Sequence, residues 1–306
     1  GTNEVWLRSY SGHGPDSAAA AVQLGSSGQA QAPALAVAQG AGLVLAWPDG
    51  LSGNPSGSLT IQLVTVSGQA LHTVTVLPQD SAATLHGVVA ASLPDGRWVL
   101  AWAENNAGVE RLWAQVHAAD GSSAMPALAI TTLGTPTDAP LAVTTLDEDR
   151  FLIGWTVPVS VSRSEVHGRV YTAVDGSAQS AEWVLQDPGQ ASGNKQDLLA
   201  LTLTDGRALL TWADSGLADG AAGTAVLAQV VELRQAGQAL TGSAAADDWV
   251  GTPWNDQLSG MGGLDRLAGG AGDDTYQPGS ADATLVERAN QGTFDSVLVA
   301  FDYRLA

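Results

Sequence analysis

Four aspartates recur at intervals of nine residues near the end of the chain: Asp247, Asp256, Asp265 and Asp274. A glycine stands five positions before each of them, and an apolar residue stands two positions after it. Glycine lets a tight turn point its backbone carbonyl oxygens inward, and the aspartate adds a carboxylate. Six to eight such oxygens suit a hard cation, so we expect this segment to bind Ca²⁺ rather than Zn²⁺.

The nine-residue period runs through four contiguous blocks, which begin at Gly242, Gly251, Gly260 and Gly269. The fourth block, Gly-Gly-Ala-Gly-Asp-Asp-Thr-Tyr-Gln, matches Gly-Gly-x-Gly-x-Asp-x-U-x at every position. The other three blocks keep the first glycine, the aspartate and the apolar position, but they lose one or two glycines. Residues 242–306 therefore resemble the calcium-binding nonapeptide segment of RTX proteins, a family of large secreted bacterial proteins.

The resemblance implies a short parallel β-roll in which two nonapeptides form one turn. Each ion would lie between one block and the block two further on, which pairs Asp247 with Asp265 and Asp256 with Asp274 and gives about two Ca²⁺ ions. In the earlier blocks, Ala245 and Trp254 replace the fourth-position glycine and are expected to loosen the sites. Backbone carbonyls would complete the shells, from Gly242, Ala244, Gly251 and Pro253 in the earlier turns and from Met261, Gly263, Gly270 and Gly272 in the later ones.

The charge of this segment links metal binding to folding. Residues 242–306 carry ten acidic side chains and three arginines. Carboxylates packed in a roll repel one another at short range, so a bound cation would contribute folding free energy. Because cytosolic calcium is low, we expect the segment to stay loose inside the cell and to fold outside. The resemblance accordingly implies an extracellular or cell-surface location reached by type I secretion.

The preceding sequence contains a repeat that closes on Trp47, Trp102, Trp155 and Trp212, at spacings of 55, 53 and 57 residues. Each copy predicts a strand, a tight turn and a second strand, and a further apolar strand follows it. We predict an all-β chain, with a small β-propeller-like repeat domain at residues 1–241 and the β-roll at residues 242–306. The propeller-like domain would hold four units of about 55 residues. A twisted stack of sheets or a sandwich is the alternative.

Residues 5–10 resemble the outer half of one more unit, which would complete the last blade or mark a chain cut inside a unit. The first residues have no start methionine, so we expect the chain to be a piece of a longer protein or a processed product. We expect the repeated tryptophans to be core residues between units.

Composition excludes several classes of partner. Twelve Lys and Arg against 31 Asp and Glu give a formal net charge of −19, which leaves no basic surface for nucleic acid. No apolar run approaches the roughly 20 residues of a membrane span, so we expect no membrane insertion. The absence of cysteine excludes disulfides and a thiol nucleophile.

Catalytic patterns are not found in the sequence. The five histidines are scattered and no serine lies in a Gly-x-Ser-x-Gly turn, so we predict no catalytic residue and favour a non-enzyme. The sequence is most consistent with a calcium-dependent extracellular binding or adhesion module, whose partner we expect to be a cell-surface glycan or protein. A secreted hydrolase with its active site among propeller loops, or a spacer without a ligand, are the alternatives. The sequence does not determine the oligomeric state.

Overall fold

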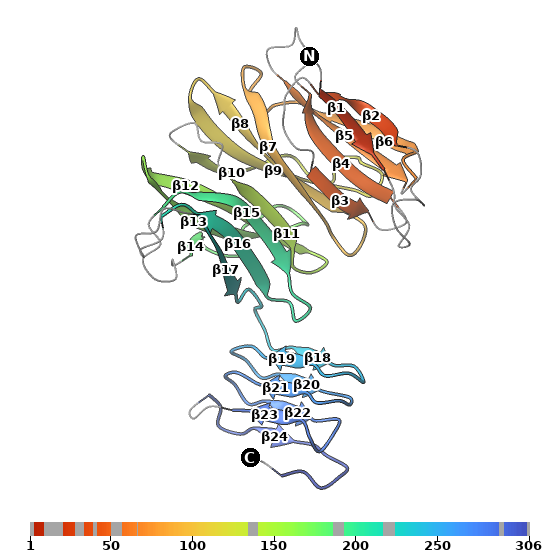
Figure 1. The fold of residues 1–306 in the computed structure, drawn as a ribbon, viewed down its shortest axis with the longest axis vertical. Coiled ribbons are helices and arrows are strands. Elements are labelled where there is room, and N and C mark those ends of the chain that lie inside the picture. Colours follow the sequence, from red (N-terminus) through yellow and green to blue (C-terminus); the bar gives the residue numbers. More distant parts are fainter. Residues whose placement is uncertain are drawn as a thin grey trace. The chain divides into compact units, whose positions relative to one another are not determined.

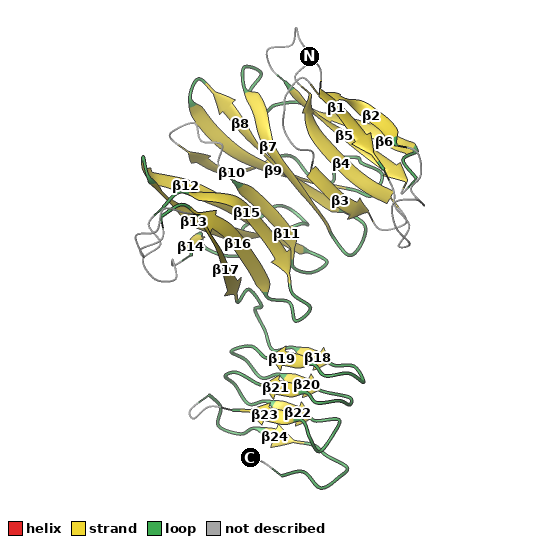
Figure 2. Ribbon diagram, in the orientation of Figure 1, coloured by secondary structure: helices red, strands yellow, loops and turns green. Residues whose placement is uncertain are grey.

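The computed structural model describes residues 3–8, 21–27, 34–38, 42–49, 57–65, 67–133, 140–185, 193–216, 224–287 and 291–304. These residues form strands and turns without a helix, which confirms the all-β prediction (Figures 1 and 2). They accordingly include no helix able to cross a membrane. Two compact units are present: unit 1 comprises residues 1–202 and 208–229, and unit 2 comprises residues 203–207 and 230–306.

Unit 1 contains four successive antiparallel sheets, one for each copy of the sequence repeat. The first sheet contains β3 (Ala34–Ala38), β4 (Gly42–Asp49), β5 (Ser58–Thr65) and β6 (Ala70–Val76). The second contains β7 (Thr84–Ser92), β8 (Trp98–Asn106), β9 (Val109–His117) and β10 (Leu128–Leu133). The third contains β11 (Leu141–Thr145), β12 (Arg150–Ser160), β13 (Arg163–Thr172) and β14 (Trp183–Val184). The fourth contains β15 (Lys195–Thr202), β16 (Ala208–Asp214) and β17 (Ala225–Val231).

Consecutive sheets pack against one another through apolar layers. The first strands of the four sheets, β3, β7, β11 and β15, are neighbours in chain order. The repeated tryptophans are at most 2% exposed, which confirms their prediction as core residues. Trp102 packs with residues of the first and second sheets, and Trp155 packs with residues of the second and third. The repeat therefore places one large aromatic side chain in the layer beside each sheet.

The turn between the paired strands follows the sequence prediction. Gly96 and Gly206 have φ values of 92° and 84°, a conformation that the Asp-Gly pairs favour. In the second sheet, Arg97 next to this turn reaches the third sheet, donating to the carbonyl of Ala173 at 2.8 Å and to Asp149 Oδ1 at 2.9 Å. These bonds help to fix the order of the sheets.

The N-terminal half unit forms a sheet of its own. β1 (Asn3–Leu7) pairs antiparallel with β2 (Val22–Ser27), and Val5 packs with Leu45, Trp47 and Val64 of the first sheet. Among the strands described, β1 pairs with β2 and not with the last sheet, so the predicted completion of the last blade is not seen. The last sheet has three described strands.

Unit 2 contains two parallel sheets of very short strands, and successive strands alternate between them (Figure 1). One sheet contains β18 (Ala239–Thr241), β20 (Gln257–Ser259), β22 (Thr275–Gln277) and β24 (Ser296–Val297). The other contains β19 (Asp248–Val250), β21 (Arg266–Ala268) and β23 (Thr284–Val286). Most strands pair with the strand 18 residues further on, so two nine-residue blocks form one coil, and we call this structure the roll.

The eighth-position apolar residues form the core of the roll. Leu258, Leu267 and Tyr276 are at most 1% exposed and pack together. Leu240, Trp249, Leu285 and Val297 cover the two ends of this core. The first coil starts at β18, before residue 242, because Leu240 pairs in register with Leu258. This coil lacks the glycines that mark the later blocks. The last coils lie beyond residue 277.

One buried ion pair in unit 1 lies between β15 and the end of β16. Lys195, the single lysine of the chain, places Nζ 2.6 Å from Asp214 Oδ2, and both side chains are fully buried. The backbone N–H groups of Gly193 and Gly216 donate to Asp214 Oδ1 at 3.1 and 2.8 Å. Burial alone would raise the pKa of Asp214, but the hydrogen bonds from Lys195, Gly216 and Gly193 outweigh burial and lower it.

We predict that Lys195→Met destabilises unit 1 by about 3–5 kcal/mol, because it leaves a buried, uncompensated carboxylate. Adding Asp214→Asn should recover most of this loss, since an asparagine oxygen still accepts from Gly193 and Gly216. Denaturant unfolding followed by tryptophan fluorescence measures the difference. Arg163→Met, which removes an exposed pair with Glu165, is the control and should cost less than about 1 kcal/mol. Equal losses of stability in Lys195→Met and Arg163→Met would contradict the prediction.

Candidate metal centre

Each sixth-position aspartate ends a turn and directly precedes a strand of the roll. Asp247 precedes β19, Asp256 precedes β20, Asp265 precedes β21 and Asp274 precedes β22. Asp256, Asp265 and Asp274 are 1% exposed, although they are charged side chains in a coil of three-residue strands. Buried carboxylates require hydrogen bonds or cations as compensation.

The structure brings together the aspartates that the sequence paired. The backbone N–H of Asp247 donates to Asp265 Oδ1 at 3.1 Å, and that of Asp256 donates to Asp274 Oδ1 at 2.7 Å. The same contact extends to both sides, from Gln238 N to Asp256 Oδ1 and from Asp274 N to Asp295 Oδ1 at 2.9 Å. The carboxylates of Asp256, Asp265, Asp274 and Asp295 thus each hold the coil before them, and they follow one another along the roll.

The second carboxylate oxygen differs between the earlier and later coils. In the earlier coils, Asp247 Oδ2 and Asp256 Oδ2 accept the N–H of Ser243 and Thr252, both at 2.6 Å. In the later coils, Asp265 Oδ2 and Asp274 Oδ2 are buried and have no hydrogen-bond partner among the described residues. Uncompensated oxygens therefore gather in the C-terminal half of the roll.

A buried guanidinium occupies the N-terminal end of unit 2. Arg234 is 4% exposed and donates to the carbonyl oxygens of Val250 at 2.9 Å and Gly251 at 2.7 Å. Burial opposes its charge, but Glu232, Asp205 and Asp256 outweigh that effect and raise the pKa of Arg234. The predicted ligand oxygen of Gly251 is therefore already hydrogen-bonded to a cation that belongs to the chain.

The other predicted carbonyl ligands lie in the turns of the coils. Gly263, Gly270 and Gly272 have φ values of 106°, 100° and 108°, and a Cβ on Gly270 would come within 2.3 Å of the carbonyl oxygen of Thr252. The carbonyl of Gly263 accepts from Ser280 Oγ at 2.6 Å. The remaining predicted positions, Gly242, Ala244, Pro253 and Met261, lie in turns between the short strands.

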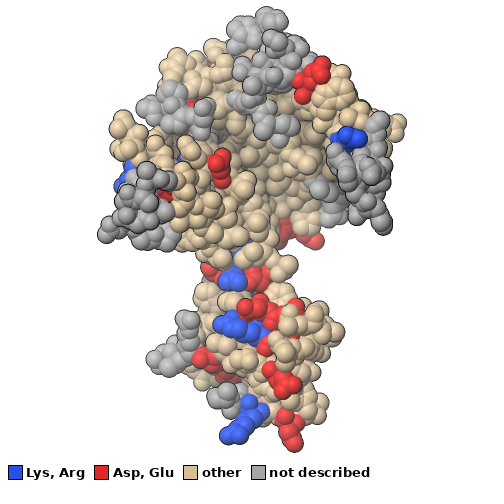
Figure 3. Space-filling model, viewed as in Figure 1, with Lys and Arg blue, Asp and Glu red and all other residues tan. Residues whose placement is uncertain are grey.

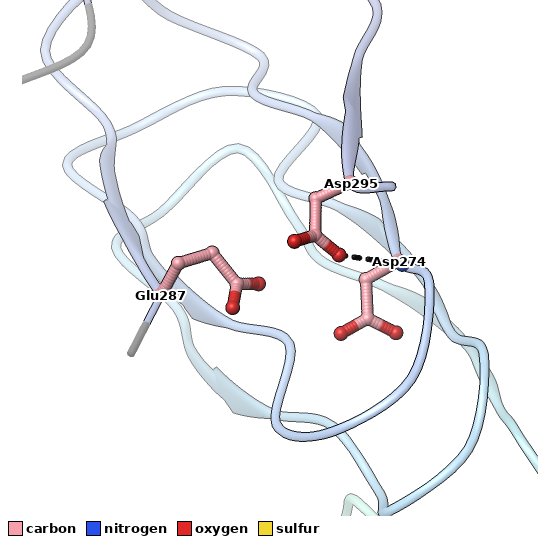
Figure 4. Close-up of side chains that lie close together, drawn as sticks. All are labelled: Asp274, Glu287 and Asp295. Atoms are coloured by element: carbon pink, nitrogen blue, oxygen red, sulfur yellow. Dashed lines mark hydrogen bonds between the residues drawn. The ribbon is translucent and has the colours of Figure 1, made fainter. Parts of the chain in front are cut away.

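Two acidic residues of the site were not predicted from the sequence, Glu287 and Asp295. With Asp274 they place one carboxylate oxygen each within 4.8 Å of one another (Figure 4). Asp295 stands 21 rather than 18 residues after Asp274, so the regular spacing misses it. The sequence feature that could have identified Asp295 is Val297, which stands two positions after it, as the apolar residue does after the aspartate in every block.

Burial and charge repulsion both act on the pKa of Asp274. Burial, together with the negative charges of Asp256, Glu287 and Asp295, raises the pKa of Asp274 to about 6. Acidic side chains also gather on the visible surface of unit 2 (Figure 3). Buried unpartnered carboxylate oxygens beside glycine turns are the donors that a hard cation prefers, so these residues fit Ca²⁺.

Two groups of polar side chains lie near the second sheet in the described part of unit 1. At one edge of the second sheet, His86 Nε2 lies 3.8 Å from Oε2 of Glu110, which is fully buried, and Glu104 is 2% exposed. Glu104 accepts the N–H of Gln79 at 2.7 Å and Trp102 Nε1 at 3.0 Å, so it anchors the neighbouring loop. A hollow of about 610 Å³ lies between β6 and the turn after β9, lined in part by His72, His117 and Asp120.

Comparisons with known proteins assign no family. No family model matches the sequence, and no curated protein matches it either. Among solved structures, an endo-arabinase from Bacteroides thetaiotaomicron has a TM-score of 0.44 at 11% identity, over 70% of this chain and 82% of that one. A protein of unknown function from Dyadobacter fermentans has a TM-score of 0.46 at 15% identity, over 67% of this chain and 54% of that one.

A third similar structure is the β-propeller domain of the Trilobed protease from Pyrococcus furiosus. Its TM-score is 0.38 at 10% identity, over 66% of this chain and 55% of that one. Scores and identities this low assign neither an activity nor a residue role to the chain.

We predict that the metal-free roll becomes more stable as the pH falls from 7 towards 5. A carboxyl group whose pKa is raised on folding binds its proton more tightly in the folded state, so stability is lost as the pH rises through about 6. Thermal unfolding in chelator across this pH range measures the trend. Asp274→Asn should flatten it, and a roll whose stability increases with pH would contradict the prediction.

Proposed function

We propose that unit 2 is a calcium-dependent folding module of an extracellular protein, and that unit 1 is the binding unit that it accompanies. The observation that carries the proposal is that two buried oxygens, Asp265 Oδ2 and Asp274 Oδ2, have no hydrogen-bond partner among the residues that the structure describes. Leaving ionised carboxylates buried without compensation is too costly for a stable fold. A divalent cation supplies that compensation.

The proposed ligands are the aspartate pairs of the nonapeptide pattern. Asp247 and Asp265 would hold one ion, and Asp256 and Asp274 would hold a second, with carbonyl oxygens of the glycine turns. When bound, the ion neutralises the stacked carboxylates. The RTX-like spacing of the blocks supports Ca²⁺ and an extracellular location, where such modules typically bind calcium at about 10⁻⁴ to 10⁻³ M.

We predict that Asp265→Asn changes the two states of the roll in opposite directions. Without metal the variant should be more stable than the wild type, because a buried charge is gone while Asn Oδ1 still accepts from Asp247 N. With calcium it should be less stable, and its half-saturating concentration should rise about tenfold or more. Thermal unfolding in chelator and across a calcium titration measures both effects.

Asp282→Asn is the matched control, since Asp282 is an exposed carboxylate in the same unit. It should leave the calcium dependence unchanged. A wild-type melting point that calcium does not raise would refute the proposed function. If Asp265→Asn is less stable than the wild type both in chelator and in calcium, Asp265 acts only as a structural hydrogen-bond acceptor.

Two features support the proposal that unit 1 is a propeller-like binding unit. Its sheets follow the sequence repeat, and their first strands are neighbours in order, as blades of a propeller are. We propose a cell-surface glycan or protein as its partner. The second candidate is a secreted hydrolase, which the fully buried Glu110 favours, because its Oε2 lies 3.8 Å from His86 Nε2 and a carboxyl group and an imidazole are side chains that general acid–base catalysis uses.

One experiment separates these readings. The full chain with calcium is incubated with a panel of immobilised glycans and polysaccharides, and both retention and released product are measured. Binding requires retention without product. Hydrolysis requires product that Glu110→Gln abolishes and Arg163→Gln, a change at an exposed position, leaves unchanged. If neither retention nor product is detected, the result favours a spacer without a ligand.

A further inference from the structure

The roll continues past its four regular blocks, and its last coil changes one ligand position. β23 pairs in register with β21, so that Val286 lies opposite Ala268. The next residue is Glu287 in one coil and Gly269 in the other. At this position the regular blocks offer a backbone carbonyl of glycine, whereas the last coil adds a carboxylate.

Glu287 faces the unpartnered oxygen of Asp274. A Cβ added to Gly269 would clash with Asp274 Oδ2 and with the Tyr276 hydroxyl and would lie 2.7 Å from Glu287 Oε1, so these three oxygens lie beside the bare glycine. Tyr276 donates its hydroxyl hydrogen to Glu287 Oε1 and orients the carboxylate. Asp295 contributes the third carboxylate, held by the N–H of Asp274 through Oδ1 (Figure 4).

We propose a further cation site at the C-terminal end of the roll, held by the carboxylates of Asp274, Glu287 and Asp295 and suited to Ca²⁺. The proposal rests on the proposed function insofar as the roll binds calcium. Two observations support it: the three oxygens lie within 4.8 Å of one another, and Asp274, which this site would share with the Asp256–Asp274 pair, is 1% exposed and its Oδ2 has no hydrogen-bond partner among the described residues.

The number of carboxylates at this site determines when it fills relative to the other calcium sites. Three carboxylates surround it, whereas the regular pairs offer two. Because calcium affinity rises with the number of charged ligands and with rigidity, this site should fill before the others. It would also join β24 to β22 and so order the C-terminal flank together with the roll.

Isothermal calorimetry of the full chain with calcium chloride, after removal of metal by chelator, tests the site. Glu287→Gln and Asp295→Asn should each bind one ion fewer than the wild type and lose the tightest phase of the titration. Both replacements keep the oxygen that accepts the observed hydrogen bond, from Tyr276 in one case and from Asp274 N in the other. The double variant should bind as many ions as either single variant, because both residues hold the same ion.

Asp302→Asn removes an exposed carboxylate of the same flank and should leave the number of ions unchanged. If the wild type binds calcium and the Glu287 and Asp295 variants bind the same number of ions with the same affinity, the further site is refuted and the proposed function stands. If the wild type binds none, the proposed function itself fails. Circular dichroism at saturating calcium shows whether each variant is folded.

Discussion

The roll depends on carboxylates that stack directly above one another. Asp265 and Asp274 each use one oxygen to accept the backbone N–H of the aspartate one coil earlier, at 3.1 and 2.7 Å. This contact sets the register of strands only three residues long, which have few hydrogen bonds of their own. The same contact brings negative charges together where water is excluded, so the interaction that orders the coils also creates the repulsion that opposes them.

The repulsion between carboxylates is offset differently at the two ends of the roll. At the N-terminal end, the buried Arg234 brings a permanent positive charge to Glu232 and the carbonyls of Val250 and Gly251. Ser243 and Thr252 satisfy the second oxygens of Asp247 and Asp256 there. At the other end, Asp265 and Asp274 each have one oxygen without a hydrogen-bond partner in the described part of the chain. The positive charge of Arg234 thus offsets the negative charge in the first coil, and we infer that bound cations offset it in the last coils.

Much of this organisation follows from the sequence, because it is periodic. The recurring tryptophans and the Asp-Gly turns predicted the paired strands of unit 1, and the nine-residue spacing predicted which aspartates become neighbours. Asp295 was missed because the last coil contains three additional residues, which break the spacing before the register is restored at β24. Glu287 was missed because it stands at the regular spacing but at a position where the other blocks have glycine. The role of Arg234 escaped as well, since a lone arginine before the first glycine block has no periodic partner. The pairing of β1 with β2 depended on packing against the first sheet, which no local pattern encodes.

Hydrogen–deuterium exchange of the full chain, with and without calcium, tests the central claim most directly. The account predicts that amides between residues 238 and 298 exchange rapidly in chelator and slowly in calcium, with the C-terminal coils showing the larger change and unit 1 almost none. Equal protection of these amides in both conditions would show that the stacked carboxylates are stable without an external cation, and would contradict the account.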